Sequence, residues 1–504
     1  MMNLTLFVSF FVLGVIGWVI YKIFIWPFYI SPLRKIPGPP SENPITGNFK
    51  ELTTEESGFS EPQHRWVKKY GNIVKYHGLF NEPTLYIADS KIIQGMTLSN
   101  TYNFVKPFNA SALAIAGIGL FFAEGENHRR QRKMMNPAFT YSNVKEMAPA
   151  FVRITLILKG LIENEVKLGK SNINLSPYLS KTTLDMIGIV GFSYEFNSLT
   201  SSNELAAAYE SVFNLPASNL RIAISLLANY VPLVRQIPVD INKKFKNACA
   251  IIERVSKKLT EEKYNEAKYG ELKGKDLLSL LININKTLPD EEKINDTELK
   301  HQIMTFLIAG HETTNVTTCW ALHLLAQHPH EQDLLREELV KAFPDKSNFN
   351  PTYDEINSLE YLNCVTKETL RLNPPLPTIT RTNLKDEVFG EYFIPKNTPI
   401  FIGVSALHKS TEIWGPTADK YNPKRWLDPS SIKDVTNLNY MPFFNGARGC
   451  IGSKVALVEI KILLGMLIRN FVFQPIEGLH IRRKVFPTPK PEPYLGLAVS
   501  IVES

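Results

Sequence analysis

The most hydrophobic stretch of the chain lies at its start. Residues Leu4 to Tyr21 include no charged side chain, and Ile23 to Phe28 continue the apolar pattern beyond the single Lys22. About 20 apolar residues are needed to cross a bilayer, so residues 1–28 predict an uncleaved transmembrane anchor. The nearby positive charges, Lys22, Arg34 and Lys35, all follow the apolar core, which predicts that the body of the protein faces the cytoplasm. A buried N-terminal core helix is the alternative.

A proline-rich segment follows the anchor. Ile36-Pro37-Gly38-Pro39-Pro40 cannot be helical, because proline lacks the backbone N–H and restricts the residue before it. We therefore expect residues 29–40 to form a stiff hinge. No second linker, low-complexity tract or repeat follows, so residues 41–504 are expected to form one large domain.

The pattern beyond the hinge is mostly helical. Strand-like runs occur at Ile73–Tyr76 and Thr84–Ile87, and helical periodicity then continues to about residue 370. The expected fold class is mainly α with minor β near the start and the end. Between Phe104 and Phe122 the sequence is apolar, small and irregular, which predicts a loop that either lines a pocket or simply packs.

One long helix carries a polar interruption. Asn295 or Asp296 can cap it, and the pattern runs to His328 before Pro329, on the order of 50 Å. Its middle reads Ala309-Gly310-His311-Glu312-Thr313-Thr314. Small residues there would admit a flat cofactor, and Glu312 beside Thr313 could relay protons. A kinked helix with a partly exposed glutamate is the alternative.

Charged residues before the C-terminal region form a possible network. Glu368 and Arg371 stand at i and i+3 on a predicted helix, within pairing reach. Arg425 follows in a segment rich in proline and aromatic residues. The three residues form a buried charged network, or else Glu368 and Arg371 are an ordinary surface pair that Arg425 does not join.

Among the four cysteines, Cys450 is the candidate for a reactive or metal-binding thiolate. The chain is 44% hydrophobic and 21% charged, as in a globular protein with a large core. Its four widely spaced cysteines suggest neither a zinc cluster nor a disulfide framework, and they suit a reducing compartment. Cys450 lies between glycines, two residues after Arg448 and before a helical pattern, where a thiolate is favoured. It is a nucleophile, a metal ligand or an inert buried thiol.

Basic residues gather between Glu126 and Lys133. On a helix, His128 and Arg132 share one side, while Arg129 shares another with Lys133. One pair could meet an internal anion, or the whole run could be a solvated face. The net charge of +7 is modest for this length.

Together these motifs resemble the cytochrome P-450 family of haem-thiolate monooxygenases. The family's cysteine signature, Phe-x-x-Gly-x-Arg-x-Cys-x-Gly, is met by Phe443, Gly446, Arg448, Cys450 and Gly452. Its Ala-Gly-x-Glu-Thr-Thr, Glu-x-x-Arg and Pro-x-Arg motifs occur in the family's order at Ala309–Thr314, at Glu368 and Arg371, and at Pro423 and Arg425.

The resemblance implies a cofactor and roles for named residues. Haem b would be held by the Cys450 thiolate as axial ligand, with Phe443, Gly452 and Ala309 beside it, and Glu312 with Thr313 would supply protons. Arg448, Arg381 and Arg132 would pair with haem propionates. His128 stands where the family usually has Trp, and it can also donate a hydrogen bond to a propionate.

The resemblance also implies partners and a place in the cell. We expect a single-pass protein of the endoplasmic reticulum membrane, with NADPH-cytochrome reductase and cytochrome b5 as partners and no nucleic acid. Basic residues at the face carrying the cysteine would dock the reductase: Arg129, Arg130, Lys133, Lys424 and Lys454.

The expected reaction inserts one atom of dioxygen into an apolar substrate, such as a lipid, sterol, terpenoid or foreign compound. Leu376–Ile379 would help line its pocket, with Thr378 as a polar contact. One alternative is a haem-thiolate isomerase or dehydratase that uses no dioxygen, against which Glu312 and Thr313 argue. Another is a haem carrier without turnover. A cysteine hydrolase fits least, because no motif ties a histidine to Cys450.

Overall fold

The computed structural model describes residues 4–53, 61–213, 224, 227–228, 231–269, 274–345, 348–485 and 488–502. The chain forms two compact units that alternate along the sequence. The first, here the sheet unit, combines Met1–Pro107, Leu376–Asp419 and Asp434–Gly449. The second, the helical unit, combines Phe108–Pro375, Lys420–Lys433 and Cys450–Ser504.

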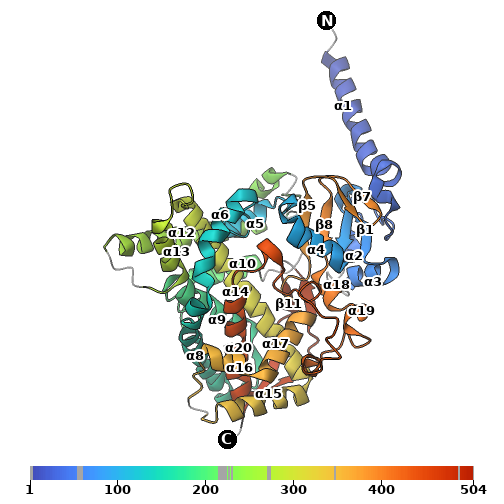
Figure 1. Ribbon diagram of the computed structural model, residues 1–504. Coiled ribbons are helices and arrows are strands. Elements are labelled where there is room, and N and C mark those ends of the chain that lie inside the picture. Colours follow the sequence, from blue (N-terminus) through green and yellow to red (C-terminus); the bar gives the residue numbers. More distant parts are fainter. Residues whose placement is uncertain are drawn as a thin grey trace. The chain divides into compact units, whose positions relative to one another are not determined.

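The sheet unit begins with the apolar helix expected from the sequence. Helix α1 (Leu4–Ile20) continues into the wider turns of η1 (Tyr21–Ile30) and projects away from the sheet of its own unit (Figure 1). Within Leu6–Ile30 the most apolar window has a mean hydropathy of 2.2 and is not buried at all. This helix is long and apolar enough to be a membrane anchor.

A five-stranded sheet forms the body of this unit. Its order is β1 (Ile73–His77), β2 (Pro83–Ile87), β8 (Pro399–Ile402), β5 (Ile379–Asn383) and β3 (Phe104–Val105), and only the β2–β8 pair is parallel. The two strands predicted near residues 73 and 84 are therefore confirmed. Smaller elements of this unit are η2 (Pro32–Lys35), α2 (Phe49–Thr53), α3 (Glu61–Tyr70), α4 (Ser90–Gln94), the hairpin β6 (Glu387–Phe389) and β7 (Tyr392–Ile394), α18 (Val404–His408) and α19 (Thr411–Trp414).

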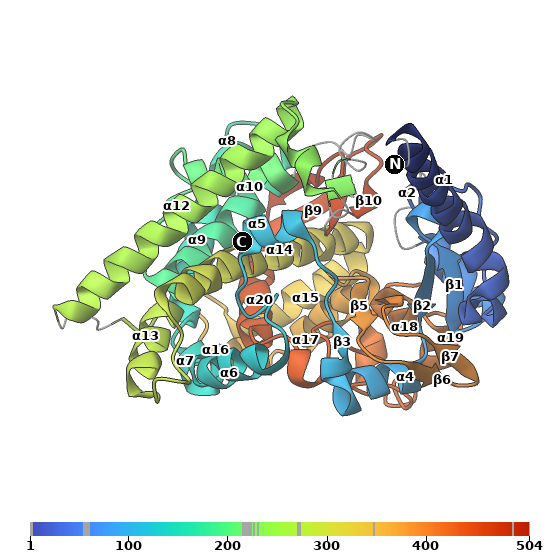
Figure 2. The ribbon, with the colours of Figure 1, turned by 90° about the horizontal axis from the view of Figure 1, so that it is seen from above.

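Helix α14 (Asp296–Gln327) is the axis of the helical unit, as Figure 2 shows. It packs against α9 (Ser176–Phe192), α12 (Asp240–Lys268) and α20 (Ser453–Asn470). Asn295 caps it in a reciprocal capping box with Glu298, so the predicted start is confirmed. Gly310 lets α9 approach closely, because a Cβ at this position would lie 2.8 Å from Cδ1 of Ile187.

The other elements of the helical unit surround this axis. The helices are α5 (Ala110–Ala116), α6 (Gly125–Met135), α7 (Tyr141–Lys145), α8 (Ala148–Lys167), α10 (Glu204–Phe213), α13 (Leu277–Thr287), α15 (Pro329–Ala342), α16 (Tyr353–Ser358) and α17 (Glu360–Leu372). The strands are β4 (Asn172–Asn174), β12 (Gly496–Ile501) and β9 (Phe471–Pro475) in one sheet, and β10 (Arg482–Val485) and β11 (Pro489–Glu492) in a hairpin. The mainly α fold with minor β is confirmed.

The predicted loop between Phe104 and Phe122 contains regular structure instead. Strand β3 begins it, and α5 forms in its small apolar part. The side chain of Asn109 accepts a hydrogen bond from the Ala112 N–H at 2.9 Å and so caps α5. Gly117, with φ of 66°, ends the helix. The prediction was wrong because these caps were not recognised in an alanine-rich sequence, which favours helix.

A glutamate lies buried between the two central helices of this unit. The Thr314 hydroxyl on α14 donates to Oε2 of Glu459 on α20 at 3.2 Å, and Oε1 of Glu459 has no hydrogen-bond partner within the described residues. Desolvation raises the pKa of Glu459 to about 8. The acid is therefore protonated at neutral pH.

We predict that Glu459→Gln makes thermal stability less dependent on pH. The pKa of about 8 in the folded chain compares with 4.5 for a free glutamate, so the folded state binds the extra proton between these values. Wild-type stability therefore falls as the pH rises from 5 to 8, and the Gln variant lacks this contribution. The Tm of the variant minus that of the wild type should increase over this range. A difference that stays constant with pH would contradict the assignment.

Candidate functional site

The cysteine segment folds as a strained loop in the sheet unit before it enters the helical unit. Phe443 is half-buried, and Phe444 and Gly446 have positive φ angles of 58° and 68°. A Cβ on Gly446 would lie 2.0 Å from the carbonyl oxygen of Thr97, so only glycine fits this position. A short 3-10 turn, η9 (Gly446–Arg448), leads to the cysteine, and α20 begins just after Gly452.

Cys450 is an exposed residue, whereas Cys319 and Cys364 are buried. A backbone hydrogen bond from Gly452 and the charge of Arg132 both lower the thiol pKa, but desolvation outweighs them and raises it above its ordinary value. The thiolate at Cys450 therefore stays a prediction for the metal-bound state. A bound cation would reverse this balance, since metal coordination deprotonates a thiol.

The middle of α14 has one accessible face in an otherwise buried stretch. Ala309 is exposed and Thr313 half-buried, while Phe306, Leu307 and Thr314 are buried. The Thr313 hydroxyl donates to the Ala309 carbonyl at 2.7 Å, the back-bonding expected from its place in the helix. Ala309 leaves room for a group to lie against the helix at this point.

Glu312 does not meet Thr313 in this structure. Its carboxylate is buried and accepts a hydrogen bond from the Thr488 hydroxyl at 2.6 Å, and the Lys490 ammonium lies 2.9 Å from the same oxygen. His311, the preceding residue, lies 2.9 Å from the Ser180 hydroxyl, and desolvation lowers its pKa to about 4. The acid and the alcohol thus lie on different faces of α14.

Helix α6 directs one pair of residues inward, as its spacing predicts. His128 is buried, and Arg132 is half-buried with its Nε donating to Asn136 Oδ1 at 3.0 Å. Its other cations are paired locally: Arg129 with Glu126, Arg130 with Glu298, and Lys133 with Glu292. These pairs weaken the expected role of the three as a docking surface.

The sheet unit brings three cations together. Desolvation lowers the pKa of Arg381 to about 10, and its guanidinium stacks over Phe444 at 5.3 Å. Desolvation also lowers the pKa of Arg448 to about 10. The third cation, Lys106, was not predicted as a site residue, because in the sequence it is a single lysine beside Pro107. Desolvation and the charges of Arg381 and Arg448 lower its pKa well below the ordinary value.

These two sets of residues fit the group that the resemblance implies. Haem b carries an iron that needs an axial donor and two propionates that need cations. Cys450 in the helical unit is an exposed residue, and Lys106, Arg381 and Arg448 form a desolvated positive cluster in the sheet unit. Desolvated cations are tolerated when anions pair with them.

The charged residues before the cysteine form a buried network in the helical unit. Arg371 makes two 2.8 Å hydrogen bonds to the Glu368 carboxylate, and Arg425 Nε lies 3.3 Å from it. The Trp426 indole and the Asn422 N–H each donate to Glu368 at 3.0 Å. All three charged side chains are buried. The network joins α17 to the segment 420–426.

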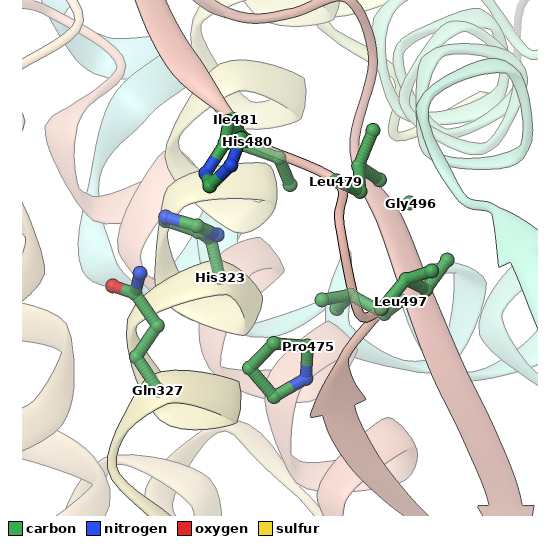
Figure 3. A pocket seen from close by; sticks show the side chains of 9 residues that line it. His323, Gln327, Pro475, Leu479, His480, Ile481, Gly496 and Leu497 are labelled. Carbon is green, nitrogen blue, oxygen red and sulfur yellow. The ribbon is translucent and has the colours of Figure 1, made fainter.

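A separate pocket of about 160 Å³ lies in the helical unit, near the C-terminal end of α14 (Figure 3). His323, Gln327 and His480 provide its polar side, and Pro475, Leu479 and Leu497 provide apolar surface. It shares no lining residue with the candidate site.

Comparison with known proteins matches the family model for cytochrome P450 to residues 37–494. Cytochrome P450 monooxygenase 205 of Postia placenta is 36% identical over 88% of this chain and 87% of its own length. A second monooxygenase of that fungus, number 128, is 36% identical over 93% of this chain and 92% of its own. A ganoderic acid synthetase of Ganoderma lucidum is 32% identical over 89% of each chain.

We predict that Glu368→Gln strongly destabilises the protein. The change removes the charge that two buried guanidiniums share, and breaking such a buried pair costs about 3–5 kcal/mol. Asp333→Asn is the matched control, because it removes the exposed partner of Arg336 and should cost about 1 kcal/mol or less. Denaturant unfolding measures both. Equal effects would show that the buried network contributes no more than a surface pair.

Proposed function

Because the chain belongs to the cytochrome P450 family of haem-thiolate monooxygenases, we propose that it inserts one atom of dioxygen into an apolar organic substrate, with electrons from NADPH through a reductase. The observation that carries this proposal is Cys450, an exposed residue in the family's signature beside Gly452 and Arg132. The apolar character of accessible residues supports the substrate class: Ala309 in the helical unit, and Leu376 in the sheet unit.

Different residues would bind different parts of the haem. Cys450 would bind the iron through Sγ, and Lys106, Arg381, Arg448 and Arg132 would pair with the propionates. The bound haem supplies the chemistry of dioxygen reduction. Phe443 and Gly452 shape the loop around the thiol, and His128, buried on α6, is proposed as a further propionate donor.

Protein groups supply the protons. The Thr313 hydroxyl holds a proton at Oγ1 on the accessible face of α14, and Glu312 is the acid of the pair. Thr378, in the sheet unit before β5, could present a polar contact to the substrate.

The anchor supports a place at a membrane. We propose a single-pass protein of the endoplasmic reticulum with its body toward the cytoplasm, served by NADPH-cytochrome reductase and cytochrome b5. The apolar helix Leu6–Ile30 and the positive charges after its core support this orientation.

The first test is a carbon monoxide difference spectrum of the reduced protein. Wild type should give the red-shifted Soret band of thiolate-ligated haem, Cys450→Ala should lose it, and Cys319→Ala, which changes a buried thiol, should keep it. Retention of the band in Cys450→Ala would refute the ligand assignment. Absence of the band from wild type would refute haem-thiolate function.

A second prediction concerns Lys106. Its removal should weaken the positive cluster, so Lys106→Ala is expected to lose haem several-fold faster than wild type to an excess of apomyoglobin. Lys91→Ala, which removes an exposed lysine of the same unit, is the control and should lose haem at the wild-type rate. If the two variants release haem equally fast, Lys106 does not hold the cofactor.

A further inference from the structure

We propose that Lys490 and Thr488, on the C-terminal hairpin β10–β11, are positioning residues that hold Glu312 withdrawn from Thr313, and that protons enter the site along this hairpin. The inference rests on the proposed function, because it concerns the protons that dioxygen reduction consumes. It assigns the supply of these protons to the hairpin β10–β11, which contains no recognised sequence motif.

The contacts at Glu312 are unequal between its two oxygens. Thr488 and Lys490 both bind Oε1, at 2.6 and 2.9 Å. Oε2 is buried and has no hydrogen-bond partner among the residues that the structure describes. A buried carboxylate oxygen without a partner is costly, so its persistence suggests a use. One oxygen is tethered, and the other is left to take or release a proton.

The hairpin is fixed to α14 by contacts that do not involve Glu312. The Trp320 indole N–H donates to the Pro489 carbonyl, and the Arg483 guanidinium stacks over the Trp320 ring at 5.6 Å. Arg483 also donates to the Leu372 carbonyl at 2.9 Å. Trp320 lies about 12 Å beyond Glu312 along the same helix. Thr488 and Lys490, which flank Pro489, are therefore held at a set place over Glu312.

Exposure falls from the hairpin towards the helix. The Lys490 side chain is 18% exposed, while that of Glu312 is 4% exposed. Solvent thus reaches the ion pair from the Lys490 side. Consecutive residues of a helix point about 100° apart, so Glu312 must leave Lys490 to approach Thr313. The adjacent His311 does not compete for the carboxylate as a cation, because its pKa is lowered to about 4.

The proposed cycle moves one proton and no electron through the protein. Glu312 would take a proton from a hydronium ion of the solvent at the hairpin side, which leaves water, and its neutral acid would then leave the ammonium of Lys490. The acid would give this proton to the Thr313 hydroxyl as that hydroxyl releases its own proton into the site. The carboxylate would then return to Lys490.

The test compares Lys490→Met, Lys490→Arg and Thr488→Val with Lys484→Met in the full-length holoenzyme. Lys484 is the matched control, since it lies on the same hairpin and pairs with Glu492 instead. The first readout does not depend on turnover: it is the infrared band of a protonated carboxyl. This band should grow in Lys490→Met, because the ammonium that favours the charged form is gone, and its absence from the double variant Lys490→Met/Glu312→Gln would assign it to Glu312.

The second readout is the share of NADPH electrons released as hydrogen peroxide, measured with a diflavin reductase and no added substrate. Without Lys490 the carboxylate has no cation that draws it back to the hairpin to take up the next proton, so Lys490→Met should raise this share several-fold and enlarge the solvent isotope effect on NADPH oxidation. Thr488→Val should do so less, and Lys490→Arg should restore wild-type behaviour. Thr488→Val keeps the test decisive if Lys490→Met does not fold.

The carbon monoxide spectrum distinguishes failure of this inference from failure of the proposed function. If every variant keeps the thiolate band but Lys490→Met and Thr488→Val match Lys484→Met in both readouts, the hairpin has no role in proton supply and the inference falls. If wild type lacks the band, the proposed function itself fails.

Discussion

Burial of charge away from water is the constraint on which the helical unit depends. Three of the carboxylates that it buries, those of Glu368, Glu312 and Glu459, are stabilised in different ways. Glu368 is matched by two guanidiniums, Glu312 by one ammonium and one hydroxyl, and Glu459 by a lone hydroxyl, so that it keeps its proton. The pairing of each carboxylate fits its place in the structure. The fully paired acid joins α17 to the segment before the cysteine, the half-paired acid is free to change partners, and the protonated acid links α14 to α20.

The sheet unit has the opposite problem, an excess of desolvated positive charge. Lys106, Arg381 and Arg448 come from three distant parts of the chain, and the repulsion among them opposes their assembly. Strand β5 fixes Arg381, and the loop with positive φ angles before η9 fixes Arg448. The fold thus holds cations together that would separate in a flexible chain. An anion with two carboxylates would remove this repulsion.

Much of this arrangement can be predicted from the sequence, because periodicity and fixed spacing act locally. The anchor, β1, β2 and the capped α14 follow from hydrophobic patterns and one capping box. The residues that were missed lack such a signal. Lys106 and Lys490 are single lysines beside prolines, and their meaning depends on contacts made across long stretches of chain. Glu312 was recognised as an acid, but its orientation depends on Thr488, 176 residues away. A charge pattern on one helix cannot indicate which hairpin will cover it.

The distance in sequence between Glu312 and Thr488 has a consequence for synthesis of the protein. Glu312 leaves the ribosome 176 residues before Thr488, a delay on the order of 10 s or more at ordinary rates of translation. During this time the anchor can insert, but α14 has no cation to accompany its carboxylate into an apolar interior. The nascent helical unit must therefore keep Glu312 in water, or keep it protonated, until the hairpin arrives. The hairpin β10–β11 therefore completes the burial of Glu312 late in synthesis, and a product truncated before it would expose apolar surface that chaperones and proteases recognise.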